Sequence, residues 1–384
     1  MANDKAFKIK NGLNAKRYLQ NKTVVSASDI DLSTGTYFTK TPTANTTFTI
    51  SNPPASGTAA SFALEITGAN VVTGYDLANA SYDNKSFDVS SQEGTLRGTE
   101  FNSDGTKLYV VGTDTDSVYQ YSLSTAYDVS TASYDSVSFS VSSQETNPCG
   151  IRFKTDGTKM FIVGFANDNV YEYSLSTAFD ISSASYTTSF SVSTQDTAPL
   201  GLAFKPDGTR MYIAGNINDN IFQYSLSTAW DISTASYDNK AANITPQDTV
   251  VVDVGFKSDG TKMFVAGSSG EDINQYSLST AWDVSTASFD NVIFETHNEE
   301  TNINGFTIKP DGTKFYTSGT TSDTVFQYSF SSSALATIAY PASVKFSGGT
   351  TPSAPANGEK DLLVFTTTDG GTTYFGKQAG DALS

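Results

Sequence analysis

The sequence predicts an all-β protein whose largest part is a five-bladed β-propeller, and three observations support this prediction. A stretch such as "FKPDGTRMYIAG" at 204–215 occurs in five close copies, whose Asp-Gly turns are 51 or 52 residues apart. Most copies are followed by a block such as "IFQYSLSTAWDISTASYD" at 221–238. Residues 75–93 match only the last quarter of a unit, and the fifth unit ends near Phe330 without that quarter.

Each repeat is expected to fold into four short strands. The first strand ends before an Asp-Gly-Thr turn, because Gly takes positive φ freely and Asp bonds its own backbone. The second strand, such as "RMYIAG", is apolar at consecutive positions, which predicts burial of both faces. The third is "VYQYSLS" from Val118, and the fourth is "SFSVSS", with Phe139 and Val141 on one face. The turn aspartates are Asp104, Asp156, Asp207, Asp259 and Asp311.

The incomplete units at the two ends of the repeat region complement each other. A leading strand without its blade and a last blade without its final strand predict a ring closed by exchange of that strand. An open solenoid would not need such a match. We therefore expect five blades within residues 75–334.

The flanks of the propeller are expected to form one split domain. Residues 23–74 and 335–384 are rich in Thr, Ser and Gly, with alternating apolar residues typical of strands. Expected strands include "TTFTI", "SFALEITG", "ASVKF" and the Asp-Gly-Gly hairpin in "DLLVFTTTDGGTTYFG". A ring closed at its own ends can be inserted into a loop of another domain. The sequence therefore predicts a β-sandwich-like domain interrupted by the propeller.

Residues 1–22 form a basic arm. They carry six of the 23 Lys and Arg of the chain, and no apolar stretch of signal-peptide length is present. The arm either frays as a solvated terminus or docks on another protein of an assembly. The candidate docking residues are Lys5, Lys8, Lys10, Lys16, Arg17 and Lys22.

The composition argues against several classes of function. The only His is His297 and the only Cys is Cys149, so a Ser-His-Asp or Cys-His site, a zinc cluster and an intrachain disulfide are not expected. The formal net charge of −17 argues against binding to nucleic acid. The chain lacks an apolar run long enough to span a membrane. We expect no cofactor and no metal, including Ca²⁺ at 113–117 or 270–274.

Most carboxylates recur in register, which is typical of turns and caps rather than of catalysis. Glu100 and Asp253 are exceptions on first strands near the axis, and a glycosidase would need such a non-symmetric pair. We expect no enzyme activity, with a propeller glycosidase as the alternative. The two registered sets are Asp116, Asp168, Asp219, Glu271 and Asp323, and Asp76, Asp128, Asp180, Asp231 and Asp283.

A repeated aromatic position is the sharpest binding candidate. Tyr127, Phe179, Trp230 and Trp282 occupy it, and Tyr75 lies one residue nearer to its Asp. Such rings either stack on sugar rings of a bound glycan or wedge between blades as part of the core. The second candidate surface consists of turns that differ between blades. These turns are 113–117, 165–169, 216–220, 268–272 and 320–324.

Three segments of the flanks carry a resemblance to a known family: "FKIKNGLNAKRYLQ", the stretch from "DIDLSTGTYF" to "EITGA", and the C-terminal part from "YPASVKF". They resemble virion structural proteins of tailed bacteriophages and are most similar to tail-fibre-like proteins of marine phages. The repeats resemble YVTN-type propeller repeats of surface proteins. The resemblance implies a protein of the virion surface that contacts other virion proteins and forms a homo-oligomer, with a trimer favoured. It implies a tail fibre, spike or adhesin that attaches to a host glycan or protein, or alternatively a decoration protein without a ligand.

Overall fold

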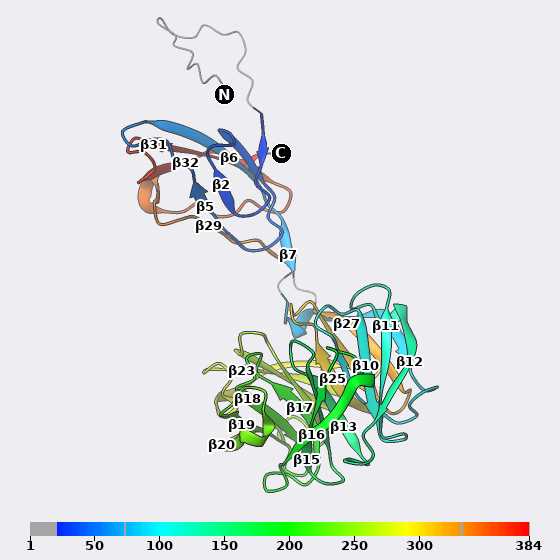
Figure 1. Ribbon diagram of the computed structural model, residues 1–384. Helices are drawn as coiled ribbons and strands as arrows, with labels where there is room; N and C mark the ends of the chain where they lie inside the picture. Colours follow the sequence, from blue (N-terminus) through cyan, green and yellow to red (C-terminus); the bar gives the residue numbers. More distant parts are fainter. Residues whose placement is uncertain (1–20, 73, 331–332, 384) are drawn as a thin grey trace, which may run out of the picture. The chain divides into compact units, whose positions relative to one another are not determined.

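The computed structural model describes residues 21–72, 74–330 and 333–383. The chain divides into two compact units, each seen in Figure 1. One unit spans Thr73–Ser332, and the other combines Met1–Val72 with Ser333–Ser384. The predicted limits of the propeller, 75 and 334, differ from these bounds by two residues at each end.

The first unit is a five-bladed propeller, so the predicted fold class is confirmed. Blade 1 consists of β9 (Leu96–Phe101), β10 (Lys107–Gly112), β11 (Ser117–Leu123) and β12 (Ala132–Ser140). Blade 2 consists of β13 (Pro148–Phe153), β14 (Lys159–Gly164), β15 (Asn169–Leu175) and β16 (Ala184–Ser191). Blade 3 consists of β17 (Pro199–Phe204), β18 (Arg210–Gly215), β19 (Asn220–Leu226) and β20 (Ala235–Asn243). Blade 4 consists of β21 (Val251–Phe256), β22 (Lys262–Gly267), β23 (Asp272–Leu278) and β24 (Ala287–Glu295). Blade 5 consists of β25 (Ile303–Ile308), β26 (Lys314–Gly319), β27 (Thr324–Phe330) and β8 (Ala80–Asp88).

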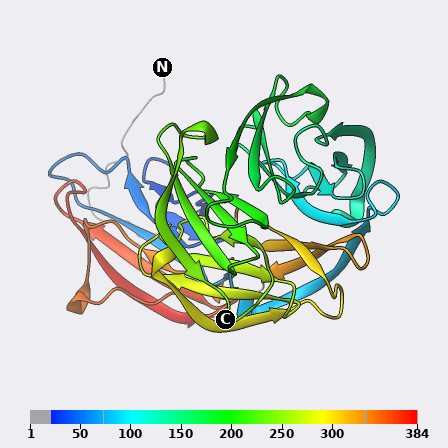
Figure 2. The same cartoon turned by 90° about the horizontal axis from the view of Figure 1, so that it is seen from below.

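The first strand of each blade lies at the centre of the ring. β9, β13, β17, β21 and β25 contact one another in this order, and β25 contacts β9 again. The blades follow the sequence around the ring, from cyan through green and yellow to orange in Figures 1 and 2. Second strands are buried on both faces, as their consecutive apolar residues predict. The axis is therefore lined by one short strand from each blade.

The ring is closed by the N-terminal strand, as predicted. β8 pairs antiparallel with β27, so that Ala80 lies opposite Phe330 and Asp88 opposite Thr324. The Asp83 carboxylate accepts hydrogen bonds from Lys314 Nζ, Gln327 Nε2 and Ser329 Oγ, each at 2.7 Å. Burial raises the pKa of Asp83, but these donors outweigh it and hold the pKa below the ordinary value of a carboxyl.

We expect Asp83→Ala to destabilise the propeller by about 2 kcal/mol, because it leaves three donors without their acceptor. A carboxyl with a lowered folded pKa contributes stability above its unfolded pKa and loses it as the pH falls through the folded pKa. The difference between variant and wild type, measured by urea unfolding, should therefore shrink on acidification. Asp88→Ala on the same strand removes a carboxylate that bonds one residue, Ser90, and is the control, which should cost less than Asp83→Ala. A difference that does not change with pH would contradict this account.

The fourth strands begin earlier than the sequence suggested. In blade 1, β12 begins at Ala132, and Val141 lies beyond its end. The strand bends where Ser136 takes a φ of 58° and the register with β11 shifts. This bulge interrupts the alternation of apolar residues, which hid the first half of the strand. Short 3-10 helices precede the fourth strands: η1 (Leu77–Asn79), η2 (Val129–Thr131), η3 (Ile181–Ser183), η4 (Ile232–Thr234) and η5 (Val284–Thr286).

The second unit is built from both flanks. Its main sheet has the order β1 (Thr23–Val24), β3 (Tyr37–Lys40), β6 (Ala60–Thr67), β31 (Lys360–Thr367), β32 (Tyr374–Leu383) and β30 (Val344–Phe346). Three two-stranded pairs accompany it: β2 (Asp29–Asp31) with β5 (Thr49–Ser51), β4 (Thr46–Thr47) with β29 (Ile338–Ala339), and β7 (Asn70–Val72) with β28 (Ser333–Leu335). A further 3-10 helix is η6 (Ser347–Gly349). The segment before the propeller and the segment after it thus share one sheet.

The core of this unit also joins the two flanks. Phe38, Phe62 and Leu64 pack in one buried cluster with Leu363 and Phe365, which come about 300 residues later in the sequence. The rings of Phe62 and Phe365 stack with their centroids 4.8 Å apart. Neither segment could bury this apolar surface alone. In the part of the chain that the structure describes, no helix has the length and apolar character needed to cross a membrane.

Candidate functional site

An open cup lies at the end of the propeller axis that carries the Asp-Gly turns, and we call this end the turn mouth. Its two hollows of about 180 and 280 Å³ share Glu100, Phe153 and Thr307 among their lining residues. Each blade contributes one residue to the floor, one to the wall and one to the rim. The floor residues are Glu100, Arg152, Ala203, Gly255 and Thr307, the wall residues Phe101, Phe153, Phe204, Phe256 and Ile308, and the rim residues Ser103, Thr155, Pro206, Ser258 and Pro310.

Charged residues gather at the floor of this cup. The Arg152 guanidinium donates from Nη2 to both carboxylate oxygens of Asp253, at 3.0 and 2.9 Å, and to the carbonyl oxygen of Phe306 at 3.1 Å. Its Nε lies 3.5 Å from Oε2 of Glu100. The structure thus brings together the two non-symmetric carboxylates that the sequence singled out. Arg152, which joins them, was not among the predicted site residues.

Asp253 closes the axis below the floor. The corresponding positions in the other blades are all glycines, namely Gly98, Gly150, Gly201 and Gly305. The strands approach so closely here that a Cβ on Gly201 would lie 2.5 Å from the Cα of Asp253. The Asp253 carboxylate also accepts the backbone N–H groups of Val254 and Phe306, each at 2.9 Å. Its acceptor sites are therefore occupied by groups of the protein.

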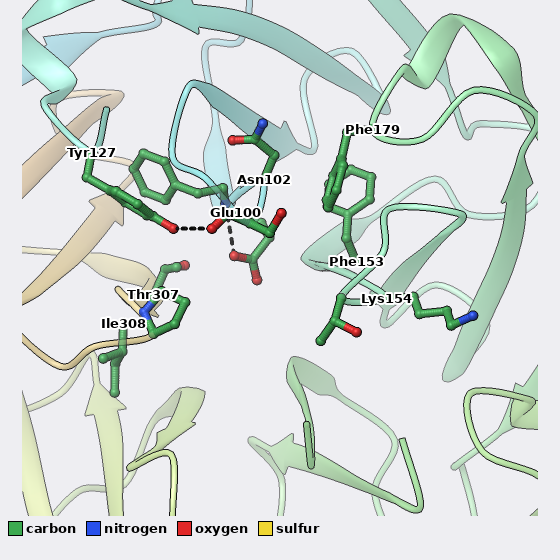
Figure 3. A pocket seen from close by; sticks show the side chains of 12 residues that line it. Glu100, Asn102, Tyr127, Phe153, Lys154, Phe179, Thr307 and Ile308 are labelled. Carbon is green, nitrogen blue, oxygen red and sulfur yellow. Dashed lines mark hydrogen bonds between the residues drawn. The ribbon is translucent and has the colours of Figure 1, made fainter. Parts of the chain in front are cut away.

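Glu100 is more available than Asp253. Its Oε1 accepts the N–H of Phe101 at 2.9 Å, and 18% of its side chain is exposed. Burial raises the pKa of Glu100 to about 7, although the positive charge of Arg152 opposes this shift. Figure 3 shows its carboxyl inside the hollow, with Tyr127 on one side and Phe153 and Phe179 on the other. At neutral pH the group can accept a hydrogen bond from a ligand hydroxyl or donate one.

We expect Glu100→Gln to stabilise the protein relative to wild type at pH 8 but not at pH 5. A carboxyl with a raised folded pKa contributes stability below its unfolded pKa and loses it as the pH rises through the folded pKa. Glutamine carries no such penalty, so the difference should grow by on the order of 2 kcal/mol between these pH values. Urea unfolding of both proteins across this range measures it. A difference independent of pH would show that Glu100 titrates normally.

The repeated aromatic residues lie on the Asp-Gly turns around the cup. All five take positive φ, from 60° to 66°, and each ring covers the turn glycine of its own unit, where a Cβ would lie about 2.1 to 2.3 Å from ring atoms. The main-chain carbonyl oxygens of Tyr127, Phe179, Trp230 and Trp282 also accept hydrogen bonds from the neighbouring blade. For example, Tyr212 donates to the Trp282 carbonyl at 2.8 Å.

The exposure of these aromatic residues differs among blades. Trp230 and Tyr75 are buried, whereas Tyr127, Phe179 and Trp282 are partly exposed. Lys309 lies over the Tyr127 ring at 5.1 Å from its centroid. Tyr127 and Phe179 line one hollow of the cup and Trp230 the other, whereas Trp282 lines neither. The rings therefore pack between blades, and only some of them also border the cup.

The recurring acids lie in turns and caps. Asp128, Asp180, Asp231 and Asp283 accept the N–H of the second residue that follows and so cap the 3-10 helices, whereas Asp76 makes no such bond. Members of the other set, Asp116, Asp168, Asp219, Glu271 and Asp323, take positive φ in the turns before the third strands.

A third set of acids was missed. One carboxylate per blade is buried at the opposite end of the axis, where it accepts backbone N–H groups from two loops; Glu93, for example, accepts those of Thr95 and Asp114. The available signal was the recurring "QE" or "QD" before the first strand, changed to "EE" in blade 5. The set comprises Glu93, Glu145, Asp196, Asp248 and Glu300.

The remaining candidates lie away from the cup. His297 is exposed and pairs with Glu271, which raises its pKa. Cys149 is buried, and burial raises its pKa to about 12. Lys22 pairs with Glu65 at 2.8 Å, whereas Lys5, Lys8, Lys10, Lys16 and Arg17 lie outside the described residues. Within residues 21–72, 74–330 and 333–383, no group of three or more His, Cys, Asp or Glu side chains could hold a metal ion.

No protein-family model and no curated protein matches the chain. Among solved structures, it is similar to a functionally unknown protein from Desulfotomaculum acetoxidans DSM 771, at 15% identity, a TM-score of 0.39 and coverage of 75% of this chain and 87% of that one. A protein from Lactobacillus plantarum matches at 14% identity and a TM-score of 0.40, covering 64% and 72%. A protein from Bacteroides uniformis ATCC 8492, provisionally described as a 6-phosphogluconolactonase, matches at 13% identity and a TM-score of 0.38, covering 73% and 70%. At these values the likenesses carry no conclusion about the activity of this chain.

Proposed function

We propose that this protein is a bacteriophage virion component of the tail-fibre, spike or adhesin kind, which displays its propeller for attachment to the host surface. The resemblance of the flanks to virion proteins supports the virion part of the proposal. The arm and the split domain would contact other virion proteins, and a homo-oligomer, with a trimer favoured, would display several propellers. The observation that carries the attachment role is the cup at the turn mouth, which all five blades build.

The cup suits a sugar residue of a host glycan. Its wall is apolar and largely aromatic, as required to cover the apolar face of a pyranose ring. Glu100 at the floor offers its carboxyl group to ligand hydroxyls, whereas the Thr307 hydroxyl is buried and donates to the carbonyl oxygen of Thr99 at 2.6 Å. The rim changes from blade to blade between Ser, Thr and Pro, so one orientation of a ligand is favoured over the other four. A pocket with few polar groups in an apolar setting is the usual form of a small-molecule site.

The same geometry disfavours the glycosidase alternative. A glycosidase needs two carboxyl groups that can reach the glycosidic bond. Asp253 is 2% exposed and bonded to Arg152 and to two backbone N–H groups, so it is committed to the protein. Glu100 alone remains for a ligand. We therefore propose binding without catalysis.

Binding of the full-length protein to a glycan array and to intact candidate host bacteria tests this function. We expect saturable binding that is lost in Glu100→Gln and in Thr155→Arg, which places a long side chain on the exposed rim. Ser138→Arg, a similar change at an exposed site on β12, is the matched control and should bind normally. If the folded wild type binds neither glycans nor cells, the attachment role is wrong, and a decoration protein without ligand takes its place.

A further inference from the structure

The opposite end of the propeller axis holds a second hollow, which we call the loop mouth. It has a volume of about 260 Å³, and all five blades line it. The glycine layer and the Arg152–Asp253 pair lie between the two mouths along the first strands. The loop mouth is therefore a separate site, and it would stand even if the turn mouth bound nothing.

The loop mouth is lined by both polar and apolar residues. The polar residues are Arg97, Asn216, Ser268, Asn302 and Asn304. The apolar residues are Phe165, Ala198, Leu200, Val250 and Val252. The blades differ at the position of Arg97. The equivalent residues in blades 2 to 5 are Cys149, Leu200, Val252 and Asn304. The repeat therefore does not require an arginine at this position.

Arg97 has no acidic partner. Among the described residues it takes part in no ion pair. Glu100, three residues later, lies at the turn mouth beside Arg152, and Glu93, four residues earlier, is used by the backbone of its own loops. Its Nη1 donates to Oδ1 of Asn304, while its Nε is buried and has no hydrogen-bond partner. The Oδ1 atom of Asn216, at the same mouth, is also buried without a partner. Buried polar groups without a partner are uncommon, and they are costly unless a ligand or water satisfies them.

We propose that the loop mouth binds a carboxylate-bearing sugar residue. A guanidinium presents a rigid fork of N–H donors that matches a carboxylate. Arg97 forms no ion pair among the described residues, because the buried carboxylates at this end of the axis accept backbone N–H groups of their own loops. The asparagine amides and Ser268 provide donors and acceptors for ring hydroxyls. The apolar lining residues provide contacts for the carbon atoms of the sugar. A volume of about 260 Å³ suits one residue rather than an extended chain.

Titration of the full-length protein with D-glucuronate and with D-glucose tests the proposal, because the two sugars differ only in the C6 carboxylate. Ligand-observed NMR or calorimetry should show binding of glucuronate and at least tenfold weaker binding of glucose. Arg97→Gln should weaken glucuronate binding at least tenfold, and Arg97→Lys should retain part of it because the charge remains. Arg210→Gln, the same change at a site that bonds the Trp282 carbonyl instead, should bind glucuronate as wild type does.

Three results would overturn the proposal. The first is equal binding of glucose and glucuronate, which would show that the carboxylate is not recognised. The second is inorganic phosphate that displaces glucuronate with equal or higher affinity, which would indicate a general anion site. The third is an Arg97→Gln variant that loses thermal stability but binds glucuronate as wild type does. That result would assign Arg97 a role in joining blades 1 and 5 through Asn304.

Discussion

Replacing Arg152 by alanine is expected to destabilise the propeller by about 3–5 kcal/mol at neutral pH, because it leaves the Asp253 charge buried without its partner. Two backbone N–H groups would still bind Asp253, but they do not neutralise it. Burial raises the pKa of Asp253 even in the intact protein. The cost of Arg152→Ala should therefore be smaller at acid pH, where Asp253 takes up a proton. Chemical unfolding at pH 4 and pH 7 measures both effects.

Two further variants separate the lost charge partner from the lost packing. Lys154→Ala, near the end of the same strand, breaks a partly exposed pair with Asp156 and should cost no more than about 1 kcal/mol. The double variant Arg152→Ala with Asp253→Gly restores the glycine of the other four blades and should be more stable than Arg152→Ala. A double variant less stable than the single one would contradict the explanation by an unpaired buried charge.

Replacing Trp230 by alanine is expected to cost about 3–5 kcal/mol, as large-to-small changes of buried tryptophan do. The ring is 8% exposed and packs against Phe204 at 5.2 Å and Phe161 at 6.2 Å between centroids. Phe161 belongs to blade 2 and Phe204 to blade 3, so the variant opens a cavity between blades. Thermal or urea unfolding followed by near-UV circular dichroism measures the loss.

Trp230→Phe is the matched control, because blade 2 has Phe179 at the equivalent position. It should cost much less than Trp230→Ala. The alternative, in which Trp230 is a stacking platform for sugars, predicts the opposite pattern, with little change in stability and a loss of glycan binding. Because Trp230 also borders the cup, binding is interpretable only for variants that remain folded at the assay temperature.

The propeller was predictable from the repeats because each blade contains the same turn sequence and the same pattern of apolar residues in its strands. Asp-Gly-Thr forms a tight turn wherever it occurs, and the consecutive apolar residues of a second strand can only be buried. The incomplete ends then implied the pairing of β8 with β27 across about 240 residues. The start of β12 was not predictable in this way, because the bulge at Ser136 breaks the alternation of buried and exposed residues.

The candidate site was only partly predictable. Glu100 and Asp253 drew notice because they break the symmetry of the repeats. Arg152 also breaks the symmetry of the repeats, but a basic residue in a strand does not by itself predict a site. Its partner became visible only in the closed ring, which brings it to Asp253, 101 residues away in the sequence. Arg97 was missed as well, because the sequence does not show that the folded protein leaves this residue without an acidic partner. The aromatic residues were found from their periodicity, but their role was ambiguous. A repeated binding site and a repeated packing contact produce the same periodic pattern.

The pairing of Ala80 with Phe330 has a mechanical consequence. Both strands of the closing pair connect to the split domain from the same end of the ladder. Tension between the split domain and an object held by the propeller would draw β8 and β27 in the same direction. The hydrogen bonds between them would then carry little shear, and the load would be shared by two strands in parallel. The pairing of β8 with β27, which closes the ring, is therefore protected from shear when force is applied through the two segments that connect the propeller to the split domain.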